Sequence, residues 1–583
     1  MHVTLAADVM PPPLSSGRLV PIRRQIGSIA RRALSSSQPS PPPPRHYDVL
    51  VVGGGATGAA LVRALALARG GRGGPSSVGV LDLRDVPPPL ADYSGAGGSG
   101  GNLGPTPNAR AYALSPVSLD LLNGGASGPG PVDRLRSAGR LAAYGTVQVW
   151  ESAGPATLRF AAEDLYGADG ASCGDGDAEG GSLLGAVAED GPLVSALWDD
   201  ILGRQGGDVG GGRMRVDFIG GATLRSIVAP PERPTDGAVP PAPVQVAYRS
   251  AAADGAPTDG TVTASLLVGA DGANSSVRRL LGMPTSGFGY GRRAVTFTVA
   301  VGGERGGMAG TAYQRMMPDG PLALLPVWGR EGRGAGATEY ANIVWSTTPS
   351  EAGRLKGLAP GELVREVNDV LQAGPVGSPP LLPPELLNDC GDRGGILPGP
   401  MAGVARAVDS LVRGANDGLA MSRWSEDPGT HAFRVPPLAT TIVGPVLAFD
   451  LSLSQAARYS GPRVALVGDA AHTIHPMAGQ GLNLGLGDVK CLAERMGEAY
   501  STGMDPGGTM HFLGRYEAER RAEAAAVLGG VHALHTAFGW RGAGNPAVLA
   551  RSLGMNLVGA IGPLRRVLAE MATGRRGVVA GLF

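Results

Sequence analysis

The chain has 583 residues, enough for about two to four structural units at roughly 100–200 residues per domain. Its 50 basic and 50 acidic residues balance, which argues against the strongly basic surface typical of nucleic-acid-binding proteins. The three cysteines, Cys173, Cys390 and Cys491, are too widely spaced for a disulfide framework or a zinc cluster. No apolar run reaches the roughly 18 residues that predict a transmembrane helix.

Residues 1–45 have the composition of a targeting segment. They contain six arginines against one acidic residue, Asp8, together with recurring serines and a terminal proline run. An Arg-rich, Ser-rich and acid-poor N-terminus is typical of an organelle transit peptide. A disordered N-terminal tail is the alternative, and composition alone does not separate mitochondrion from chloroplast.

The ordered chain opens with a predicted βαβ unit. The apolar run at 47–52 predicts a buried parallel strand, and an Ala/Leu-rich helix follows to about Arg69. A second strand is expected near 78–82.

A glycine-rich turn joins the first strand to the first helix. Gly53, Gly55 and Gly58 form G-x-G-x-x-G, whose glycines allow a tight turn, close approach of a pyrophosphate and helix–strand packing. Asp82 ends the second strand, where a carboxylate binds ribose hydroxyls. The pattern predicts a dinucleotide site without distinguishing FAD from NAD; a glycine-rich corner is the alternative.

Two further segments carry candidate site residues. Arg110 lies just before a helix that Ser115 is expected to cap, with Pro116 at its first position, although Arg110 alone also fits a surface cation. The apolar strand at 266–270 ends in Asp271-Gly272, a place where open α/β sheets bind ligands. The alternative is an aspartate that caps the helix after it.

The segment 464–489 contains the most informative string. A buried strand delivers Gly468 and Asp469 to its end, where the carboxylate can accept hydrogen bonds from a ribityl chain. Gly479-Gln480-Gly481 opens a helix whose N–H groups would stabilise negative charge on a reduced flavin. His472 and His475 allow two other interpretations, metal ligands or packed loop histidines.

The rest of the chain predicts a second sheet and a helical C-terminus. Strands are expected at 145–150, 294–301, 322–328 and 341–347, and helices from Gly479 to about Thr573. Segments dense in glycine or proline are expected to be loops or insertions, disordered in part. They are 92–107, 167–182, 205–213, 229–243, 251–260, 330–338 and 372–430.

Three motifs, in this order, resemble those of the FAD-dependent aromatic-ring monooxygenases typified by p-hydroxybenzoate hydroxylase. They are GGGATG at 53–58, GADGANSSVR at 269–278 and GDAAHTIHPMAGQGLNLGL at 468–486. Finer strings narrow the resemblance to the ubiquinone-biosynthesis ring monooxygenases of eukaryotic mitochondria: NARAYALS at 108–115, AYQRMMPDGPLALLP at 312–326, VWSTTPSEA at 344–352 and YEAERRAEA at 516–524. The resemblance spans about residues 46–575, and the block at 385–432 has no counterpart in it.

The resemblance implies an α/β fold of mixed α+β type, in which a Rossmann-type FAD-binding domain is interleaved with a mixed β-sheet substrate domain. The FAD-binding domain is expected over 46–140, 183–285 and 436–510, the substrate domain over 141–182 and 286–435, and C-terminal helices over 511–583.

The resemblance also implies roles for individual residues, with no acid or base catalyst among them because the chemistry is carried by the flavin. Pro476, Gly479, Gln480 and Gly481 would lie near the isoalloxazine, and Leu324 and Pro326 would line the substrate cavity unless they are sheet core. The other cofactor-binding residues would be Gly53, Gly55, Gly58, Asp82, Arg110, Asp271, Gly272, Gly468, Asp469 and Asn483. No metal is expected.

The implied activity is hydroxylation of a polyprenylated 4-hydroxybenzoate-type phenol at ring position C5, by O₂ through a flavin C4a-hydroperoxide. Electrons would come from ferredoxin and its reductase or from NAD(P)H. Other ubiquinone-biosynthesis proteins would be partners in a complex. A monooxygenase or reductase for another lipid, or a non-catalytic flavin-bound subunit, is the alternative.

A hydrophobic polyprenylated substrate implies contact with a membrane, and the resemblance implies the matrix face of the mitochondrial inner membrane. The segment Leu549–Arg576 has five arginines, one acid (Glu570) and leucines at helical spacing, a pattern that predicts a basic amphipathic helix on an anionic surface. A packed C-terminal helix with a solvated basic face is the alternative.

Overall fold

The computed structural model describes most of the chain after the N-terminal segment. The described residues are 44–93, 107–125, 128–162, 165, 183–204, 214–231, 242–251, 257–302, 308, 310–331, 338–388, 396–425, 433–475, 479–508, 510–539, 545–561, 566–567 and 570. Met1–Arg45 and His46–Phe583 form separate units. The expected transit peptide and most of the expected glycine-rich loops therefore lie outside the described residues.

The first sheet contains the predicted βαβ opening. Its strand order is β17-β18-β11-β1-β2-β8, and β10 joins β11 to β9. The pairs β1–β2, β2–β8 and β11–β18 are parallel, which brings the carboxyl ends of strands to one edge. The strands are β1 (Arg45–Val52), β2 (Ser77–Leu81), β8 (Arg215–Ile219), β9 (Ala222–Val228), β10 (Val244–Ser250), β11 (Thr258–Gly269), β17 (Ser460–Gly461) and β18 (Val464–Leu466).

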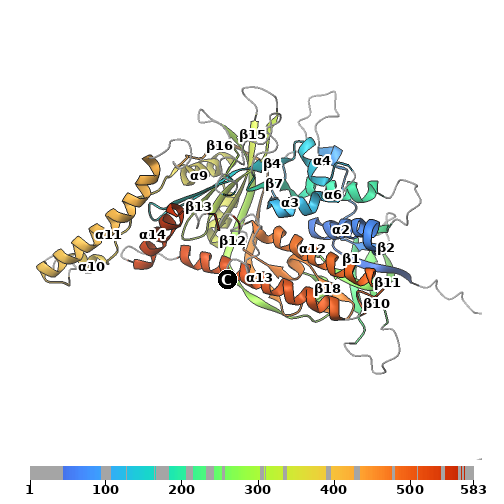
Figure 1. Cartoon of the computed structure of the whole chain (residues 1–583). Coiled ribbons are helices and arrows are strands. Elements are labelled where there is room, and N and C mark those ends of the chain that lie inside the picture. Colours follow the sequence, from blue (N-terminus) through green and yellow to red (C-terminus); the bar gives the residue numbers. More distant parts are fainter. Residues whose placement is uncertain are drawn as a thin grey trace, which may run out of the picture. The chain divides into compact units, whose positions relative to one another are not determined.

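Helices pack on this sheet because their apolar faces need cover. The glycine turn after β1 leads into α2 (Ala56–Arg72), and α12 (Gln480–Ser501) lies beside α2 (Figure 1). The other elements of this part are η1 (Leu90–Tyr93), α3 (Pro116–Asn123), α4 (Pro131–Ser137), α6 (Asp190–Gly203), α7 (Ser276–Leu280), η3 (Gly468–Ala470) and α13 (Met510–Gly539). The last helix, α14 (Pro546–Ala560), contacts α13 and packs on strand β6 (Thr157–Ala161).

The second sheet confirms the strands predicted in the middle of the chain. Its order is β19-β16-β12-β15-β14-β13-β5-β6, and all neighbouring strands are antiparallel except β13 and β5, which are parallel. The strands are β5 (Thr146–Glu151), β6 (Thr157–Ala161), β12 (Thr285–Gly302), β13 (Thr311–Met316), β14 (Leu322–Glu331), β15 (Thr338–Thr347), β16 (Leu438–Ala456) and β19 (His472–Thr473). One face packs against α8 (Pro349–Gly357) and α9 (Pro360–Gln372) in a separate apolar core.

A small third sheet stands between the two larger ones. It has the order β3-β7-β4, from β3 (Ala111–Leu114), β7 (Gly185–Glu189) and β4 (Leu141–Tyr144). Both β4 and β7 contact β14 of the second sheet. The segment that carries Arg110 enters this small sheet, so it lies where the two halves of the fold meet.

One expected domain boundary is wrong. The sequence places residues from 436 onward in the FAD-binding domain, but β16 pairs with β12 along most of its length and so belongs to the second sheet. The chain returns to the first sheet only at β17 and β18. The prediction overlooked the alternation of Leu447, Phe449, Leu451 and Leu453, which is typical of a strand with one face toward solvent.

The expectation of a loop at 372–430 is also wrong. The structure has a short helix, α10 (Pro384–Leu387), and a long one, α11 (Gly399–Ser425), which packs against α14 (Figure 1). The buried face of α11 includes Asp409 and Asn416, polar residues that hide the helical pattern. Asn416 donates to the Ser378 and Ser552 hydroxyls, so polar contacts take the place of apolar burial.

Only part of the segment expected to form a basic amphipathic helix, Leu549–Arg576, lies within the described residues. The described helix, α14, ends at Ala560, and its Arg551 is buried in an ion pair with Glu151 of β5, with Nη2 at 2.7 Å from the carboxylate. A packed helix, the alternative left open, describes α14 better. Within the described residues, no helix is both long and apolar enough to cross a membrane.

Candidate functional site

The glycine turn after β1 has the geometry needed to accept a phosphate. Gly53 has φ +104° and a Cβ there would meet the Ala270 carbonyl at 2.4 Å, while a Cβ on Gly58 would meet Gly53 O at 1.8 Å. A Cβ on Gly55 meets only the tip of Arg84, at 3.5 Å. Gly55 is the N-cap of α2 and no side chain caps this end, so its N–H groups and partial positive charge can receive an anion.

Asp82 follows β2 and stabilises the same turn. Its carboxylate accepts hydrogen bonds from Gly54 N at 2.5 Å and Arg84 N at 2.7 Å. A carboxylate has about four acceptor positions, so Asp82 can hold the turn and still accept from ribose hydroxyls.

Arg110 and Asp469, separated by most of the sequence, lie within electrostatic reach of each other. Burial raises the pKa of Asp469, and attraction to His472 and Arg110 partly offsets that rise. The Arg110 guanidinium also lies 5.3 Å from the centre of the Tyr112 ring, and its side chain is exposed. The two expected cofactor residues, one just before β3 and one in η3, therefore lie close to each other.

Asp271 is used within its own turn. Its carboxylate accepts hydrogen bonds from the Ser275 hydroxyl at 2.5 Å and from the backbone N–H of Ser276 and Val277 at 2.6 and 3.1 Å. The capping alternative therefore describes Asp271 well. Gly272, at φ +81° with no atom within 4 Å of a Cβ, leaves open space beside it.

A buried ion network that the sequence analysis missed supports Gly468 and Asp469. Asp488 of α12, completely buried, accepts from Gly468 N at 2.9 Å, contacts His472 Nε2 at 2.6 Å and accepts from Arg520 Nε at 2.8 Å. Burial opposes ionisation of Asp488, but His472 and Arg520 together lower its pKa below the ordinary value. The sequence analysis recognised Gly468-Asp469 as part of a motif. It missed Asp488 and Arg520, because no local sequence pattern marks either residue as a partner of Gly468.

The N-terminus of α12 presents backbone donors, as expected. Gly479 is its N-cap in the left-handed conformation, φ +61°, and no side chain caps it. Gln480 and Gly481 form the first turn. Pro476 lies outside the described residues.

Asn483 supports the N-terminus of α12 through its side-chain amide. Its Nδ2 donates to Ala113 O at 2.8 Å and Gly479 O at 3.2 Å, and its Oδ1 accepts from Ser115 N at 2.9 Å. Both amide protons are thereby used. Asn483 thereby joins β3 to α12, and its expected contact with the cofactor stays a prediction.

His475 is packed among rings, and His472 belongs to the Asp488 network. The His475 ring lies 5.1 Å from that of Tyr290 and 5.2 Å from that of His535. Burial, reinforced by the nearby His535, lowers the pKa of His475 to about 4. These contacts support the packed-histidine interpretation, and the described residues contain no group of three or more potential ligands arranged for a metal ion.

Leu324 and Pro326 are buried, and Leu324 lies in the core that the second sheet forms with α8 and α9. This is the sheet-core alternative to a substrate wall. Because side chains alternate along a strand, the neighbours Ala323 and Leu325 face the opposite side of β14.

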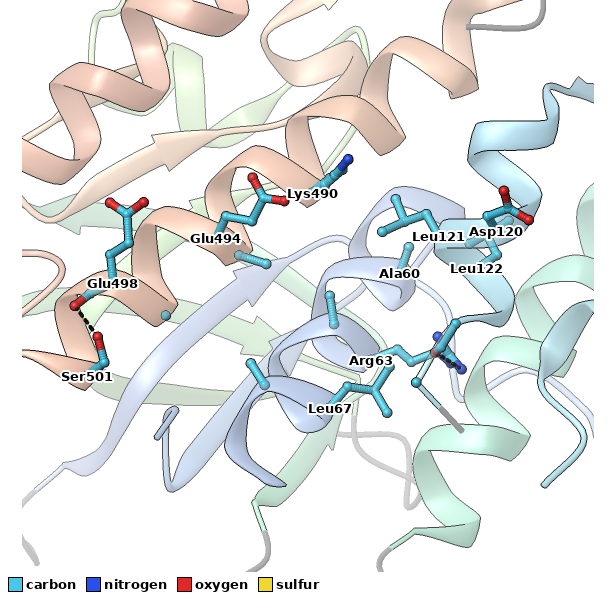
Figure 2. A pocket seen from close by; sticks show the side chains of 16 residues that line it. Ala60, Arg63, Leu67, Asp120, Leu121, Leu122, Lys490, Glu494, Glu498 and Ser501 are labelled. Atoms are coloured by element: carbon cyan, nitrogen blue, oxygen red, sulfur yellow. Dashed lines mark hydrogen bonds between the residues drawn. The ribbon is translucent and has the colours of Figure 1, made fainter. Parts of the chain in front are cut away.

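A cavity of about 760 Å³ lies between α2, α3 and α12, away from the predicted cofactor residues, none of which lines it (Figure 2). Ala60, Arg63 and Leu67 come to it from α2, and Lys490 and Glu494 from α12. Arg63 is already paired with Asp200 at 2.8 Å. This cavity therefore does not replace the site formed by the turns at 53–58 and 468–481.

The residues present fit an FAD molecule. The open Gly55 and uncapped α2 suit a pyrophosphate, Asp82 a ribose, Asp469 a ribityl chain and the uncapped α12 a flavin edge. All of these groups follow strands or begin helices, so the backbone itself fixes their positions.

Comparisons with known proteins agree with this geometry. Residues 429–530, which include Asp469 and Gly479–Gly481, match a family described as FAD binding domain. The chain is 31% identical over 311 residues to the ubiquinone biosynthesis monooxygenase COQ6, mitochondrial, of Drosophila melanogaster, covering 53% of this chain and 56% of that protein. The human protein of the same name is 30% identical over 314 residues, covering 54% and 58%. The ubiquinone hydroxylase UbiL of Rhodospirillum rubrum is 32% identical over 314 residues, covering 54% and 55%.

The similarity thus spans little more than half the length of these curated relatives. Solved structures extend the fold comparison over more of the chain. p-Nitrophenol 4-monooxygenase PnpA from Pseudomonas putida superposes with a TM-score of 0.53 at 18% identity, covering 91% of this chain and all of that one. PqsL, a probable FAD-dependent monooxygenase from Pseudomonas aeruginosa, gives 0.50 at 19% identity, covering 88% and 99%.

These matches confirm the resemblance drawn from the motifs, the fold class and FAD as the expected cofactor. The chain has the mixed α/β fold of FAD-dependent monooxygenases related to p-hydroxybenzoate hydroxylase, and its sequence is similar to that of ubiquinone-biosynthesis monooxygenases.

Proposed function

We propose that this chain is an FAD-dependent monooxygenase that hydroxylates the aromatic ring of a prenylated phenol in ubiquinone biosynthesis. The observation that carries the proposal is that Gly55 of the first motif and Asp469 and Gly479 of the distant motif at 468–486 all stand at strand ends or helix N-termini suited to one cofactor. The sequence similarity to ubiquinone-biosynthesis monooxygenases supplies the pathway.

Each cofactor-side residue has a separate task in the proposal. The N–H groups at the start of α2 bind the pyrophosphate, Asp82 accepts from the adenosine ribose and Asp469 from the ribityl chain. The first N–H groups of α12 stabilise negative charge on the pyrimidine edge of the flavin. When bound and reduced, FAD supplies the activation of O₂. The protein provides position and a site from which water is excluded.

The finer proposal is hydroxylation at C5 of a polyprenylated 4-hydroxybenzoate-type precursor. Ferredoxin with its reductase, or NAD(P)H, would supply the electrons, and other enzymes of the pathway would be partners. Action on another lipid is the runner-up, and assays with prenylated and unprenylated phenols separate the two. A non-catalytic flavin-bound subunit would bind FAD but hydroxylate neither the prenylated nor the unprenylated phenol.

We place the protein in the mitochondrion, in peripheral contact with the matrix face of the inner membrane. Support comes from α11, not from the C-terminal segment first considered. Met401, Val404, Val408 and Leu411 are exposed apolar residues at helical spacing on one side of α11. Sedimentation with vesicles of phosphatidylcholine and cardiolipin tests this contact. Val404→Asp should weaken it, and equal binding by that variant would refute the role of α11.

The experiment that tests the activity starts with an absorbance spectrum of purified residues 46–583. Flavin bands that are reduced anaerobically by ferredoxin and its reductase, followed by hydroxylation of a prenylated phenol in air, are the expected results. Asp469→Ala should lower FAD occupancy, whereas Asp450→Ala, a control on exposed β16, should not. Full flavin occupancy in Asp469→Ala would contradict the assignment of the site.

A further inference from the structure

The second sheet contains a cluster of three buried polar side chains, at positions where apolar residues would ordinarily be found in a sheet core. Thr296 and Thr298 of β12 and Asn342 of β15 are 5%, 0% and 0% exposed. Thr298 and Asn342 are directly paired across the two strands. Burying hydroxyl and amide groups costs free energy unless each finds a partner.

The partners of this cluster are the two carbonyl groups immediately before Arg110. Asn342 Nδ2 donates to Ala109 O at 3.0 Å, and Thr296 Oγ1 donates to the same oxygen at 2.8 Å. Thr298 Oγ1 donates to Asn108 O at 3.0 Å. Three buried donors on one sheet therefore fix two successive peptide groups of a segment that belongs to the other half of the fold.

The same segment is held at its far end by α12. The Asn483 amide binds Ser115 N and Ala113 O while it also donates to Gly479 O, the N-cap of α12. Between the two anchors, the Arg110 carbonyl accepts from Asp190 N at 3.0 Å. The backbone of Asn108–Ser115 is thus attached to the second sheet, to α6 and to the flavin-side helix, while the Arg110 side chain stays exposed.

Sheet formation does not explain the polarity of the cluster. The ladder between β12 and β15 uses backbone groups, and a valine has nearly the volume and shape of a threonine without its hydroxyl. Position 344, next to Asn342 on the same face of β15, is a valine. The hydroxyl and amide groups are needed for the carbonyls of Asn108 and Ala109.

We propose that Thr296, Thr298 and Asn342 are positioning residues for the cofactor: through Asn108 and Ala109 they fix Arg110 for its contact with FAD. This rests on the proposed function, in which Arg110 binds FAD. Through this contact the sheet assigned to the substrate supports one wall of the flavin site. Loss of the anchor leaves FAD able to bind but weakens its contact with Arg110.

The test is FAD affinity of the full-length protein, measured by fluorescence titration of the apoprotein. Thr298→Val and Asn342→Leu should each raise the dissociation constant about tenfold, the effect of losing one or two buried hydrogen bonds. Thr298→Ser keeps the hydroxyl and should bind FAD like wild type. Thr347→Val removes the hydroxyl of another buried threonine of β15 and serves as the matched control.

A double-mutant cycle with Arg110→Ala separates positioning from general stability. If Thr298 acts through Arg110, Thr298→Val should have little further effect once Arg110 is alanine. Additive effects, or weak FAD binding by Thr298→Ser as well, would overturn the inference while leaving the proposed function intact. Absence of FAD binding in wild type would overturn both. Because Thr298→Val is nearly isosteric, its melting temperature shows whether folding limits the measurement.

Discussion

The flavin-side turns and the contact between α11 and α14 are held by different chemistry. At the turns, backbone groups meet a fully buried charge: Asp488 binds Gly468 N, His472 and Arg520. Between α11 and α14, neutral groups meet neutral groups, as Asn556 donates to Asn416 Oδ1 at 2.9 Å. Removing one partner of a buried charge is expected to cost much free energy of unfolding, so the first region should tolerate few substitutions. Removing one neutral hydrogen-bond partner between α11 and α14 should cost less.

The strongest test of this difference is Asp488→Ala. Removing Asp488 leaves the buried Arg520 Nε and His472 Nε2 without their partner, while Arg520 keeps its ion pair with Glu523, so we expect a loss of about 3 kcal/mol in the free energy of unfolding. FAD occupancy should fall as well, because the Gly468 amide loses its acceptor. Chemical denaturation and flavin absorbance measure the two effects.

Asp259→Ala is the control for that experiment. Asp259 pairs with Arg249 at 2.7 Å, but both side chains are largely exposed, at 66% and 44%. Such surface pairs contribute little to stability because water and salt screen the attraction. A comparable loss in both variants would show that the Asp488 network does not hold the flavin-side turn more firmly than a surface pair would.

Asn416→Ala tests the other region. It leaves Ser378 and Asn556 without their contacts to Asn416, and an unsatisfied buried polar group costs about 1–3 kcal/mol. We expect faster amide hydrogen exchange in α11 and α14 with unchanged FAD binding. Weaker FAD binding in this variant would mean that the two regions are coupled.

The free energy of unfolding measured between pH 7 and pH 5 offers a third test, at His475 on the flavin side. His475 has its pKa lowered to about 4 by burial and by His535. Below its ordinary value near 6.5 the unfolded chain takes up a proton that the folded chain refuses, so stability falls as pH falls. From pH 7 to pH 5 the loss is about 2 kcal/mol. His475→Phe keeps a ring against Tyr290 and should remove this component of the slope; an unchanged slope would contradict it.

The two regions also differ in how far the sequence predicted them. Gly53 and Gly479 were found because a positive φ and an uncapped helix N-terminus impose a local residue pattern. Asp488 and Arg520 were missed because their role depends on contacts between α12, α13 and η3. Asn483 was placed on the correct helix, but its hydrogen bonds to β3 and Ser115 could not be predicted from local sequence.

The missed helix α11 follows the same logic. Its buried face carries the polar Asp409 and Asn416, which contact loop and α14 groups, while its apolar stripe at 401–411 is exposed, so the apolar residues do not mark the buried face. In β16 the apolar residues Leu447 and Phe449 are likewise exposed. Local motifs predicted the cofactor side, and tertiary contacts determined the rest.

The smallest effect expected is at a feature that the sequence did predict. Ser115 caps α3, its hydroxyl accepting from Ser118 N at 3.2 Å, with Pro116 at the first helical position. Ser115→Ala should cost about 1 kcal/mol, the usual value of an N-cap. Its backbone N–H still binds Asn483, so the link between β3 and α12 should persist and FAD affinity should hold. Ser115→Asp, which can cap the helix again, should restore stability. A large loss of FAD in Ser115→Ala alone would instead show that the hydroxyl, and not the backbone, supports the flavin side.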